Sequence, residues 1–285
     1  MADDLASVRA RIHGVEQLET VIGAMRGIAA AHAQQSRTLL PGFRAYAEVI
    51  ASAISSALRL GDGLPAVRAG GNRFARVVFS AEQGFIGGFV ERVLNELPQR
   101  GPADVLLIGS RGLSFASANG ISPVWQSAMA TRADGVTAVC IRIADALYDI
   151  VAQRRISRVE VVFPIWTSSE GLQVAFRSLL PLEEQRFRQM AATIPPLSTL
   201  PPDVLLSSLA EEYVYATLCE AAMSAFVAEN EARAAAMARA RDKLQDILTE
   251  LHLSEHRVRQ EAITAELVEL ACGTLAEEPN TRSIG

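Results

Sequence analysis

Apolar residues recur at intervals of three and four along the first sixty residues, which is the spacing of one face of an α-helix. Asp3 and Asp4 suit the start of that helix, because carboxylates interact favourably with its unpaired N–H groups. The periodic positions are Leu5, Val8, Ile12 and Val15 and, after a shift, Leu18, Val21, Ile22, Met25 and Ile28. Pro41-Gly42 interrupts the pattern. The sequence therefore predicts a helix from about Asp3 to Leu60 with a kink or a break at the proline.

A second helical pattern covers the last part of the chain, from about Asp203 to Ala276. The sequence has no proline between Pro202 and Pro279. At ~1.5 Å per residue, an unbroken helix of this extent measures on the order of 110 Å, far more than a small domain is wide. A coiled-coil spacing is present at Leu244, Ile247, Leu251, Ser254, Val258, Ala262 and Ala265. We therefore expect the two terminal helices to pair with each other.

Between the two helical patterns the period changes to short runs rich in β-branched and aromatic residues, which favours strands. The runs are 76–80, 104–110, 159–163 and 172–177, and helical stretches lie near 88–97 and 134–153. Strands that alternate with helices are typical of βαβ units, which build a parallel sheet covered on both faces. The predicted fold class is therefore α/β, with a central, mostly parallel sheet and flanking helices.

The predicted organisation has four parts. These are an N-terminal helix at 1–60, an α/β domain at 61–202, a C-terminal helix at 203–276, and a frayed polar tail at 277–285. Gly61, Gly63 and the pair Gly70-Gly71 mark a loop at the start of the α/β domain.

Composition and charge exclude several classes of function. The chain has 285 residues, 49% of them hydrophobic, and a net charge of −5, which disfavours a broad nucleic-acid-binding surface. Cys140, Cys219 and Cys272 form no CxxC pair, so we expect buried side chains in a reducing compartment rather than a disulfide framework. The acidic N-terminus is unlike a signal peptide, and no apolar run reaches the ~18–20 residues that span a bilayer. Any membrane association is expected to come through partners.

The loop from Ser80 to Phe89 follows a predicted strand and carries Gly84, Gly87 and Gly88. Glycines at such a turn can cradle a phosphate at a helix N-terminus. The loop lacks the Lys-Ser/Thr of a Walker motif and the spacing of a dinucleotide-binding motif, so a tight turn explains it more simply.

Other candidate chemistry is sparse. His252 and His256 are spaced i, i+4, as two metal ligands on one helix face would be, but Glu255 is not at the position of an HExxH motif. No nucleophile elbow or paired acid and base is found, so the sequence predicts no catalytic residue, cofactor or metal. Basic residues also cluster on the C-terminal helix: Arg233, Arg239, Arg241, Lys243, Arg257 and Arg259. They fit either a solvated coiled-coil flank with pairs such as Glu255–Arg259 or a surface for acidic loops of another protein.

Three separated stretches together resemble the γ subunits of F-type ATP synthases. The first is Arg11-Ile-His-Gly-Val15 with Ala24-Met25 and Ala29-Ala30-Ala31, and the second is the loop Glu82–Phe89. The third is Arg257–Leu270 with Gly273, and upstream of it Glu229, Arg233, Met237, Ala240 and Asp242 also fall in the family's register. The resemblance covers the whole chain in order. Thr20-Val21-Ile22, Val90, Ala240–Lys243 and Glu255-His256 depart from the family's pattern, which is typical of a divergent bacterial member, such as one from an auxiliary ATPase operon.

This resemblance implies a central-stalk rotor that lacks a catalytic site of its own. Its terminal helices form an antiparallel coiled coil inside a head of α and β subunits, and its α/β domain meets the ε subunit and the membrane c-ring. Flow of protons or sodium ions turns the rotor and drives ATP synthesis, or hydrolysis drives it in reverse. The location implied is the cytoplasmic face of the bacterial inner membrane, as a peripheral protein. Met25, Arg259 and Gln260 are the residues expected to contact the head.

Two alternatives remain open from the residues alone. One is a coiled-coil scaffold or adaptor with no rotary role, and the other is a small-molecule α/β enzyme that uses the loop at 80–89. Co-assembly with α and β subunits distinguishes the first, and ligand binding by the isolated chain distinguishes the second.

Overall fold

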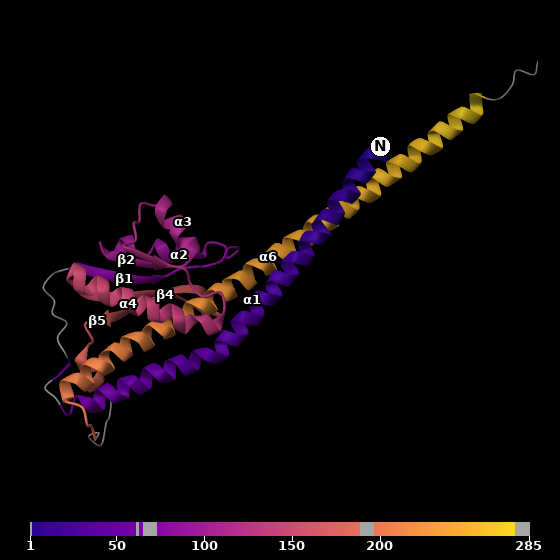
Figure 1. Ribbon diagram of the computed structural model, residues 1–285. Coiled ribbons are helices and arrows are strands. Elements are labelled where there is room, and N and C mark those ends of the chain that lie inside the picture. The colour runs from indigo at the N-terminus through magenta and orange to yellow at the C-terminus, as the bar shows by residue number, and fades with distance from the viewer. Residues whose placement is uncertain (1, 61–62, 65–72, 189–196, 277–285) are drawn as a thin grey trace, which may run out of the picture. The chain divides into compact units, whose positions relative to one another are not determined.

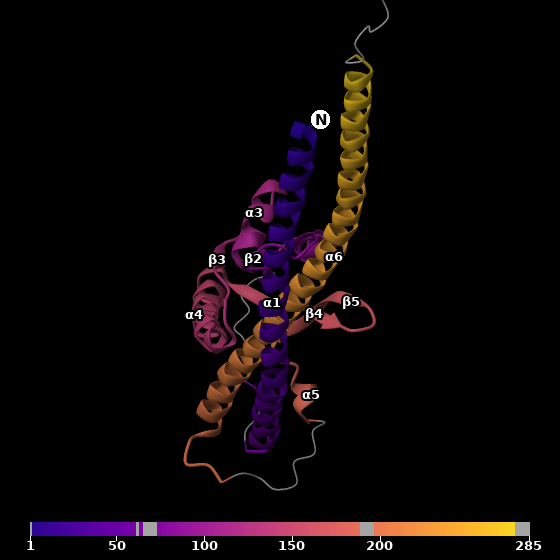
Figure 2. The same cartoon turned by 90° about the vertical axis from the view of Figure 1, so that its right-hand side faces the viewer.

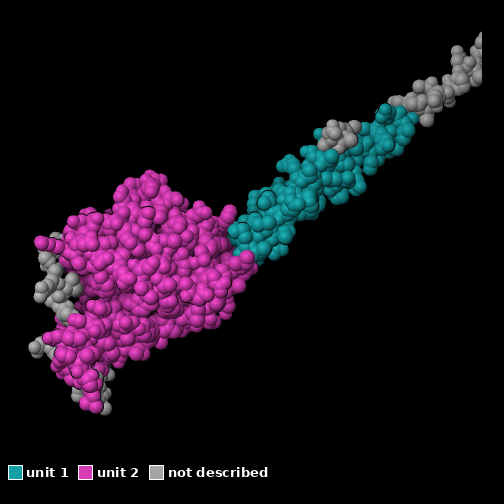
Figure 3. Space-filling model, viewed as in Figure 1, with its two compact units in different colours: residues 1–26, 237–285 teal, residues 27–236 magenta. Residues whose placement is uncertain are grey.

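The computed structural model describes residues 2–60, 63–64, 73–188 and 197–276, with side chains from Asp4 to Leu270 within those ranges. The expected loop at 61–71 lies mostly outside the described residues, and the expected tail at 277–285 lies wholly outside them. The chain forms two compact units, one of residues 27–236 and one of residues 1–26 with 237–285 (Figure 3). Two long helices, α1 and α6, contribute residues to both units.

Helix α1 spans Ala2–Ala57 and continues through Pro41, so the break considered at Pro41-Gly42 does not occur (Figure 1). A proline inside a helix removes one backbone hydrogen bond. Ion pairs with α6 lie on both sides of it, Arg37–Glu231 at 2.7 Å and Arg44–Glu220 at 3.5 Å. We attribute the continuity of α1 to this packing against a neighbouring helix, which offsets the lost bond.

The unit of residues 27–236 is built on a five-stranded sheet in the order β3-β2-β1-β4-β5 (Figure 1, Figure 2). The strands are β1 (Arg73–Phe79), β2 (Asp104–Ile108), β3 (Trp125–Ser127), β4 (Ile156–Thr167) and β5 (Gly171–Leu180). The pairs β3–β2, β2–β1 and β1–β4 are parallel, and β5 is antiparallel to β4. The prediction of a mostly parallel sheet is confirmed.

Helices cover both faces of the sheet, as the alternation of strands and helices predicts. Side chains alternate along β1, so that Val77 and Phe79 belong to one buried core and Val78 to the other. Helix α4 (Val136–Arg154) and α6 residues between 214 and 226 fill the first core. Helices α2 (Phe89–Leu94) and α3 (Ser110–Ala118) fill the second.

Helix α6 spans Pro202–Ala276, and its first part is the most buried helical stretch of this unit. A third core joins α6 to the end of α1 and to α5 (Glu184–Arg188). In it Phe187 meets Tyr213 edge to face, with ring centroids 5.2 Å apart, beside Ile54 and Leu206. Among the described residues, no helix is long and apolar enough to cross a membrane.

The described residues of the unit of 1–26 and 237–285 form a pair of helical segments, 2–26 from α1 and 237–276 from α6. All seven seam positions expected on α6 are buried or half-buried, with Leu251 the most enclosed at 8% exposure. On α1 the expected positions Leu5, Val8, Ile12 and Val15 are likewise buried or half-buried.

The second half of the expected α1 stripe is partly wrong. Leu18, Val21 and Ile28 are exposed, at 54%, 55% and 60%. The face turned toward α6 in this unit continues instead through Glu19, Ile22 and Met25, which are half-buried. The expected stripe was built from large apolar residues alone and therefore omitted Glu19. As a result it assigned Leu18 and Val21 to the buried face, although the three-four spacing runs through Glu19 and Ile22.

Candidate functional site

The two segments of the first unit run antiparallel, as ion pairs across them show. Arg9 Nε donates to Glu255 Oε1 at 2.8 Å, and Arg241 Nε donates to Glu19 Oε1 at 3.0 Å. From the first ion pair to the second, the residue number rises by ten on α1 and falls by fourteen on α6, so the two segments run in opposite directions. The hydrogen bond from Arg9 lowers the pKa of the Glu255 carboxyl below its ordinary value.

The residues expected to contact a partner lie on this helical pair but not at one place. Met25 is half-buried on α1, whereas Arg259 and Gln260 are exposed on α6. Arg9 lies level with Glu255, so Arg259 lies level with the residues that precede Arg9. At ~1.5 Å per residue, Met25 and Arg259 are therefore roughly 30 Å apart along the helices. A side chain at position 25 therefore does not approach Arg259.

The exposed surface of this pair combines apolar and basic side chains. Leu18 and Val21 project from α1, and α6 exposes Leu253, Ile263, Leu267, Val268 and Leu270. Arg239, Arg241, Lys243, Arg257 and Arg259 are exposed on α6 as well. Exposed apolar side chains in such number on a helix mark a surface that another protein covers. Glu255 accepts a hydrogen bond from Arg9, and the charge of Arg259, the partner expected from the sequence, also lowers its pKa.

Arg233 does not belong to this basic surface. It is buried in the other unit, where its Nη2 pairs with Glu229 one turn earlier on α6. The Glu229 carboxylate also accepts bonds from the backbone N–H groups of Glu82 and Gln83, both at 3.0 Å. Residues of α6 therefore hold the glycine-containing loop after β1.

These bonds decide what the loop at 80–89 can bind. Two of its backbone N–H groups are directed at Glu229, and the Glu82 carboxylate lies on its other side, bound to Ser110 and Met129. A phosphate at this position would have to displace one carboxylate and would meet the charge of a second. The loop is built as a connection to α6 rather than as a phosphate cradle. The sequence signal for it was Glu229 and Arg233 spaced i, i+4 inside an apolar stretch.

The candidate histidines and cysteines have the surroundings of residues that stabilise the fold. His252 Nδ1 lies 3.8 Å from Glu255, at a solvated helix surface. Cys140 and Cys219 are buried together between α4 and α6, and their mutual hydrogen bond and burial raise the pKa of the Cys140 thiol. Among the described side chains, no three or more histidine, cysteine or acidic groups gather as metal ligands.

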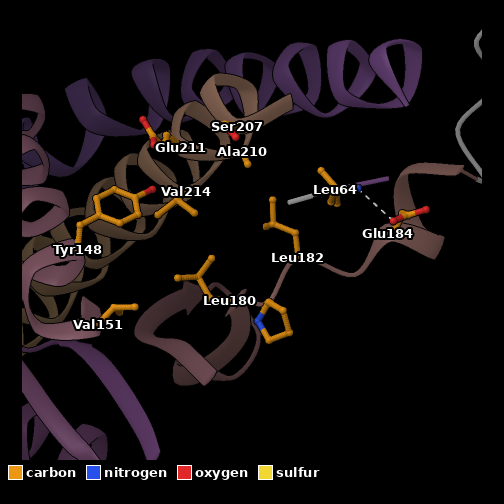
Figure 4. A pocket seen from close by; sticks show the side chains of 11 residues that line it. Leu64, Tyr148, Val151, Leu180, Leu182, Glu184, Ser207, Ala210, Glu211 and Val214 are labelled. Carbon is orange, nitrogen blue, oxygen red and sulfur yellow. Dashed lines mark hydrogen bonds between the residues drawn. The ribbon is translucent and has the colours of Figure 1, made fainter. Parts of the chain in front are cut away.

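A cavity of 370 Å³ lies where β5, α4 and α6 meet, and Figure 4 shows the side chains around it. Most of its lining is apolar, with Leu180, Val151 and Val214 prominent. Glu184 is bound to Arg188 and to the N–H of Leu64 at 3.2 Å, which lowers its pKa. Burial and the charges of neighbouring glutamates raise the pKa of Tyr148 to about 12. Glu184 therefore stays ionised and Tyr148 protonated near neutral pH, which does not suit proton transfer there.

Comparison with known proteins gives consistent matches along the chain. The model of the ATP synthase family matches residues 4–276. The chain is 23% identical to the ATP synthase gamma chain of Streptococcus suis, with 98% of this chain and 100% of that one covered. It is 24% identical to the gamma chain of Haemophilus influenzae strain PittGG, with 94% and 98% covered.

Solved structures show the same fold. A chain in the Euglena gracilis mitochondrial ATP synthase, from its OSCP/F1/c-ring part in rotational state 3, superposes with a TM-score of 0.66 at 12% identity, and both chains are covered in full. A chain in the central stalk and c-ring of the Tetrahymena thermophila mitochondrial ATP synthase superposes with a TM-score of 0.54 at 16% identity, covering 77% of this chain and 99% of that one.

Proposed function

This chain belongs to the ATP synthase gamma-chain family, and from that membership we propose that it couples transmembrane ion flow to ATP synthesis or hydrolysis as the central-stalk rotor of an F-type enzyme. The coupling ion is a proton or a sodium ion. The nucleotide chemistry belongs to the α and β subunits of the head, and this chain contributes no catalytic residue of its own.

The observation that carries the proposal is the antiparallel helical pair with an exposed apolar and basic surface. Interhelical ion pairs such as Arg9–Glu255 give the pair its register, while Leu18, Val21 and the exposed basic residues of α6 other than Arg241 stay free of the seam. A surface of this kind suits a rod enclosed by other subunits. We assign contact with the head to Met25, Arg259 and Gln260, at two separate levels of the rod.

Rotation matters only if the rod favours different conformations of the surrounding sites at different angles. A rod that contacted every site equally would shift no equilibrium, however tightly it was held. Met25 and Arg259 each lie on one side of the rod and differ in charge, so a full turn brings each of them against different surrounding subunits in succession. This inequality of contact is the physical basis of coupling.

The remaining partners follow from family membership. The α/β domain, taken as residues 61–202, is assigned to the ε subunit and the membrane c-ring, and the helices at 1–60 and 203–276 to the head. The complex would place this chain at the cytoplasmic face of the bacterial inner membrane, bound through partners alone.

The test is reconstitution. The chain is co-expressed with the α, β and ε subunits of an F-type enzyme from the same organism, and the complex is analysed by native mass spectrometry and for ATPase activity. We expect one copy per three α and three β subunits, and an ATPase rate that depends on this chain. A complex that assembles without any effect of this chain on ATP turnover would instead indicate a scaffold.

A further inference from the structure

The contact between α6 and the loop after β1 is made of charge-assisted hydrogen bonds that are buried. We call it the 229–233 clamp, and it consists of Glu229 and Arg233 on α6 with loop residues 82–84. The side chains of Glu229 and Arg233 are only 6% and 7% exposed. Glu229 accepts from two successive loop N–H groups, as described above, so both of its oxygens are engaged.

Arg233 makes the remaining hydrogen bonds of the clamp. Its Nε donates to the carbonyl oxygen of Gly84 at 3.2 Å, and its Nη1 donates to Asn230 Oδ1 at 3.0 Å. Its Nη2 bonds to Glu229. The planar guanidinium thus uses all three nitrogens in fixed directions, which the point charge of a lysine could not do.

Hydrogen bonds of the loop connect the clamp to the rest of the α/β domain. The Glu82 carboxylate accepts from Ser110 N at 3.0 Å, Ser110 Oγ at 2.8 Å and Met129 N at 2.9 Å. These residues begin α3 and follow β3, and the N–H of Arg111 donates to Ala81 O at 3.0 Å. A continuous series of hydrogen bonds therefore runs from α6 through the loop to the residues that follow β2 and β3.

The position of the clamp along α6 is as informative as its chemistry. Ala228 and Ala232 pack into the core beside α2 and α3, and Arg233 is the last buried residue of α6 before the unit ends at 236. Apolar packing is non-directional and does not by itself specify one angle of a helix about its own axis. Buried hydrogen bonds to backbone groups fix the rotational angle, because turning the helix would leave charges unpaired in the interior.

We propose that the 229–233 clamp is the joint through which torque passes between α6 and the α/β domain. The proposal rests on the rotor function proposed above, and it makes Glu229 and Arg233 positioning residues rather than contacts with another subunit. With the joint intact the domain follows α6 stiffly. With the joint opened, α6 twists against the domain before the domain moves.

The experiment measures torsional stiffness in the assembled complex. The head is fixed to a surface, and a bead is attached to the α/β domain through Asn119→Cys, an exposed position, in a Cys272→Ser background. The angular variance of the bead during a dwell is inversely related to the stiffness of the path from head to bead. We compare wild type with Glu229→Gln, Arg233→Met and Arg233→Lys.

Glu231→Gln is the matched control. It lies two residues from Glu229 on the same helix and also removes one carboxylate from an ion pair, but its partner is Arg37 of α1. We expect at least a twofold larger variance in Glu229→Gln and Arg233→Met, a smaller rise in Arg233→Lys, and no change in Glu231→Gln.

The outcomes separate the two proposals. If wild type assembles but the bead does not turn with ATP, the rotor function fails. If wild type turns and Glu229→Gln shows the same variance as Glu231→Gln, the clamp is not the joint. If none of the three clamp variants assembles, the clamp is needed for folding and the proposal is likewise overturned.

Discussion

Single residues at the start of α3 show how tightly the loop after β1 is packed. Gly112 lies on α3, and a Cβ built there would lie 2.6 Å from both Cβ and Oγ of Ser80. Ser80 is itself buried, at 2% exposure. Such a contact is shorter than any real Cβ contact, so a side chain at 112 must displace the strand end that carries the loop.

We therefore predict that Gly112→Ala destabilises the isolated chain by about 1–3 kcal/mol, the usual cost of overpacking. Gly27→Ala is the matched control, because a Cβ at position 27 of α1 meets nothing within 4 Å. Replacing a helical glycine by alanine in open space stabilises by about 0.5–1 kcal/mol. Urea unfolding followed by circular dichroism measures both. Equal effects of the two substitutions would contradict the close approach at Ser80.

At the scale of elements, the ion pair of Arg9 and Glu255 makes part of the stability of the helical pair depend on pH. The hydrogen bond from Arg9 lowers the pKa of Glu255. A carboxyl whose pKa is lower in the folded than in the unfolded state stabilises the fold above its unfolded pKa of about 4.3. That contribution is lost as pH falls through the folded pKa. The contribution of this ion pair to the helical pair should therefore be lost in acid, while the apolar seam remains.

Substitution of Arg9 tests this. We expect Arg9→Gln to raise the pKa of Glu255 toward about 4.3, the ordinary value for glutamate. Arg11→Gln removes the same charge two residues away, at another exposed position, and should leave that pKa nearly unchanged. Carboxyl carbon shifts of Glu255, followed by NMR across the acid range, report the pKa directly. An equal rise in both variants would assign the shift to the general positive charge of α1.

The antiparallel register makes a second prediction about these elements. Ile12 and Leu251 are both buried in the pair, at 7% and 8% exposure, and both lie between the ion pairs Arg9–Glu255 and Glu19–Arg241. We expect Ile12→Cys with Leu251→Cys to form a disulfide under mild oxidation. Leu18→Cys with Leu253→Cys, two exposed positions, should not. Non-reducing electrophoresis measures the yield, and the reverse result would contradict the register.

The sequence predicted elements with a strong period better than those without one. Four strands and helix α4 were expected close to their observed places, because their apolar runs are long enough to carry a signal. Strand β3 has three residues, and α3 and α5 are short, so none of them shows a clear period. Their positions depend on neighbours instead: β3 pairs with β2, and the Glu82 carboxylate binds the first N–H of α3.

The sequence predicted the family of the chain, but it did not predict the contacts between α6 and the loop residues 82–84. The motif at Arg257–Leu270 pointed to the family, and the family model matches residues 4–276. The clamp was missed because Arg233 was grouped with the exposed arginines that follow it. A one-dimensional charge pattern does not distinguish a buried arginine from a solvated one, since its partners at 82–84 are far away in sequence.

At the scale of the whole molecule, both long helices contribute residues to both compact units. The two helices differ in how they are held in the unit of residues 27–236. Helix α6 is fixed by the buried hydrogen bonds of Glu229 and Arg233, whereas the end of α1 packs through the apolar core that contains Ile54. Apolar packing is non-directional, so we infer that α6 is the helix more firmly fixed about its own axis.

Met25 lies on the more weakly held helix, at a half-buried position between Ile22 and Ala29. The antiparallel register brings it toward the residues that precede Arg241, on a helix whose exposed side is basic. Met25→Lys would place an ammonium group at this half-buried position. A charge that is desolvated and unpaired is costly, and the cost varies with rotary angle because the surrounding subunits change. A free-energy cost that varies with rotary angle creates a barrier to rotation or stabilises the rotor at an unproductive angle.

We therefore predict that the assembled Met25→Lys complex retains most of its ATP hydrolysis but pumps ions about fivefold less per ATP, the factor that about 1 kcal/mol of uneven cost produces. Met25→Leu, which keeps the size and the apolar character, should preserve both activities, and the melting temperature of the isolated Met25→Lys chain should change little. ATPase rate and ion pumping are measured on the same vesicles. Equal loss of both activities with normal assembly, or failure to assemble, would show that Met25 only packs in the seam, because a coupling contact must separate hydrolysis from transport.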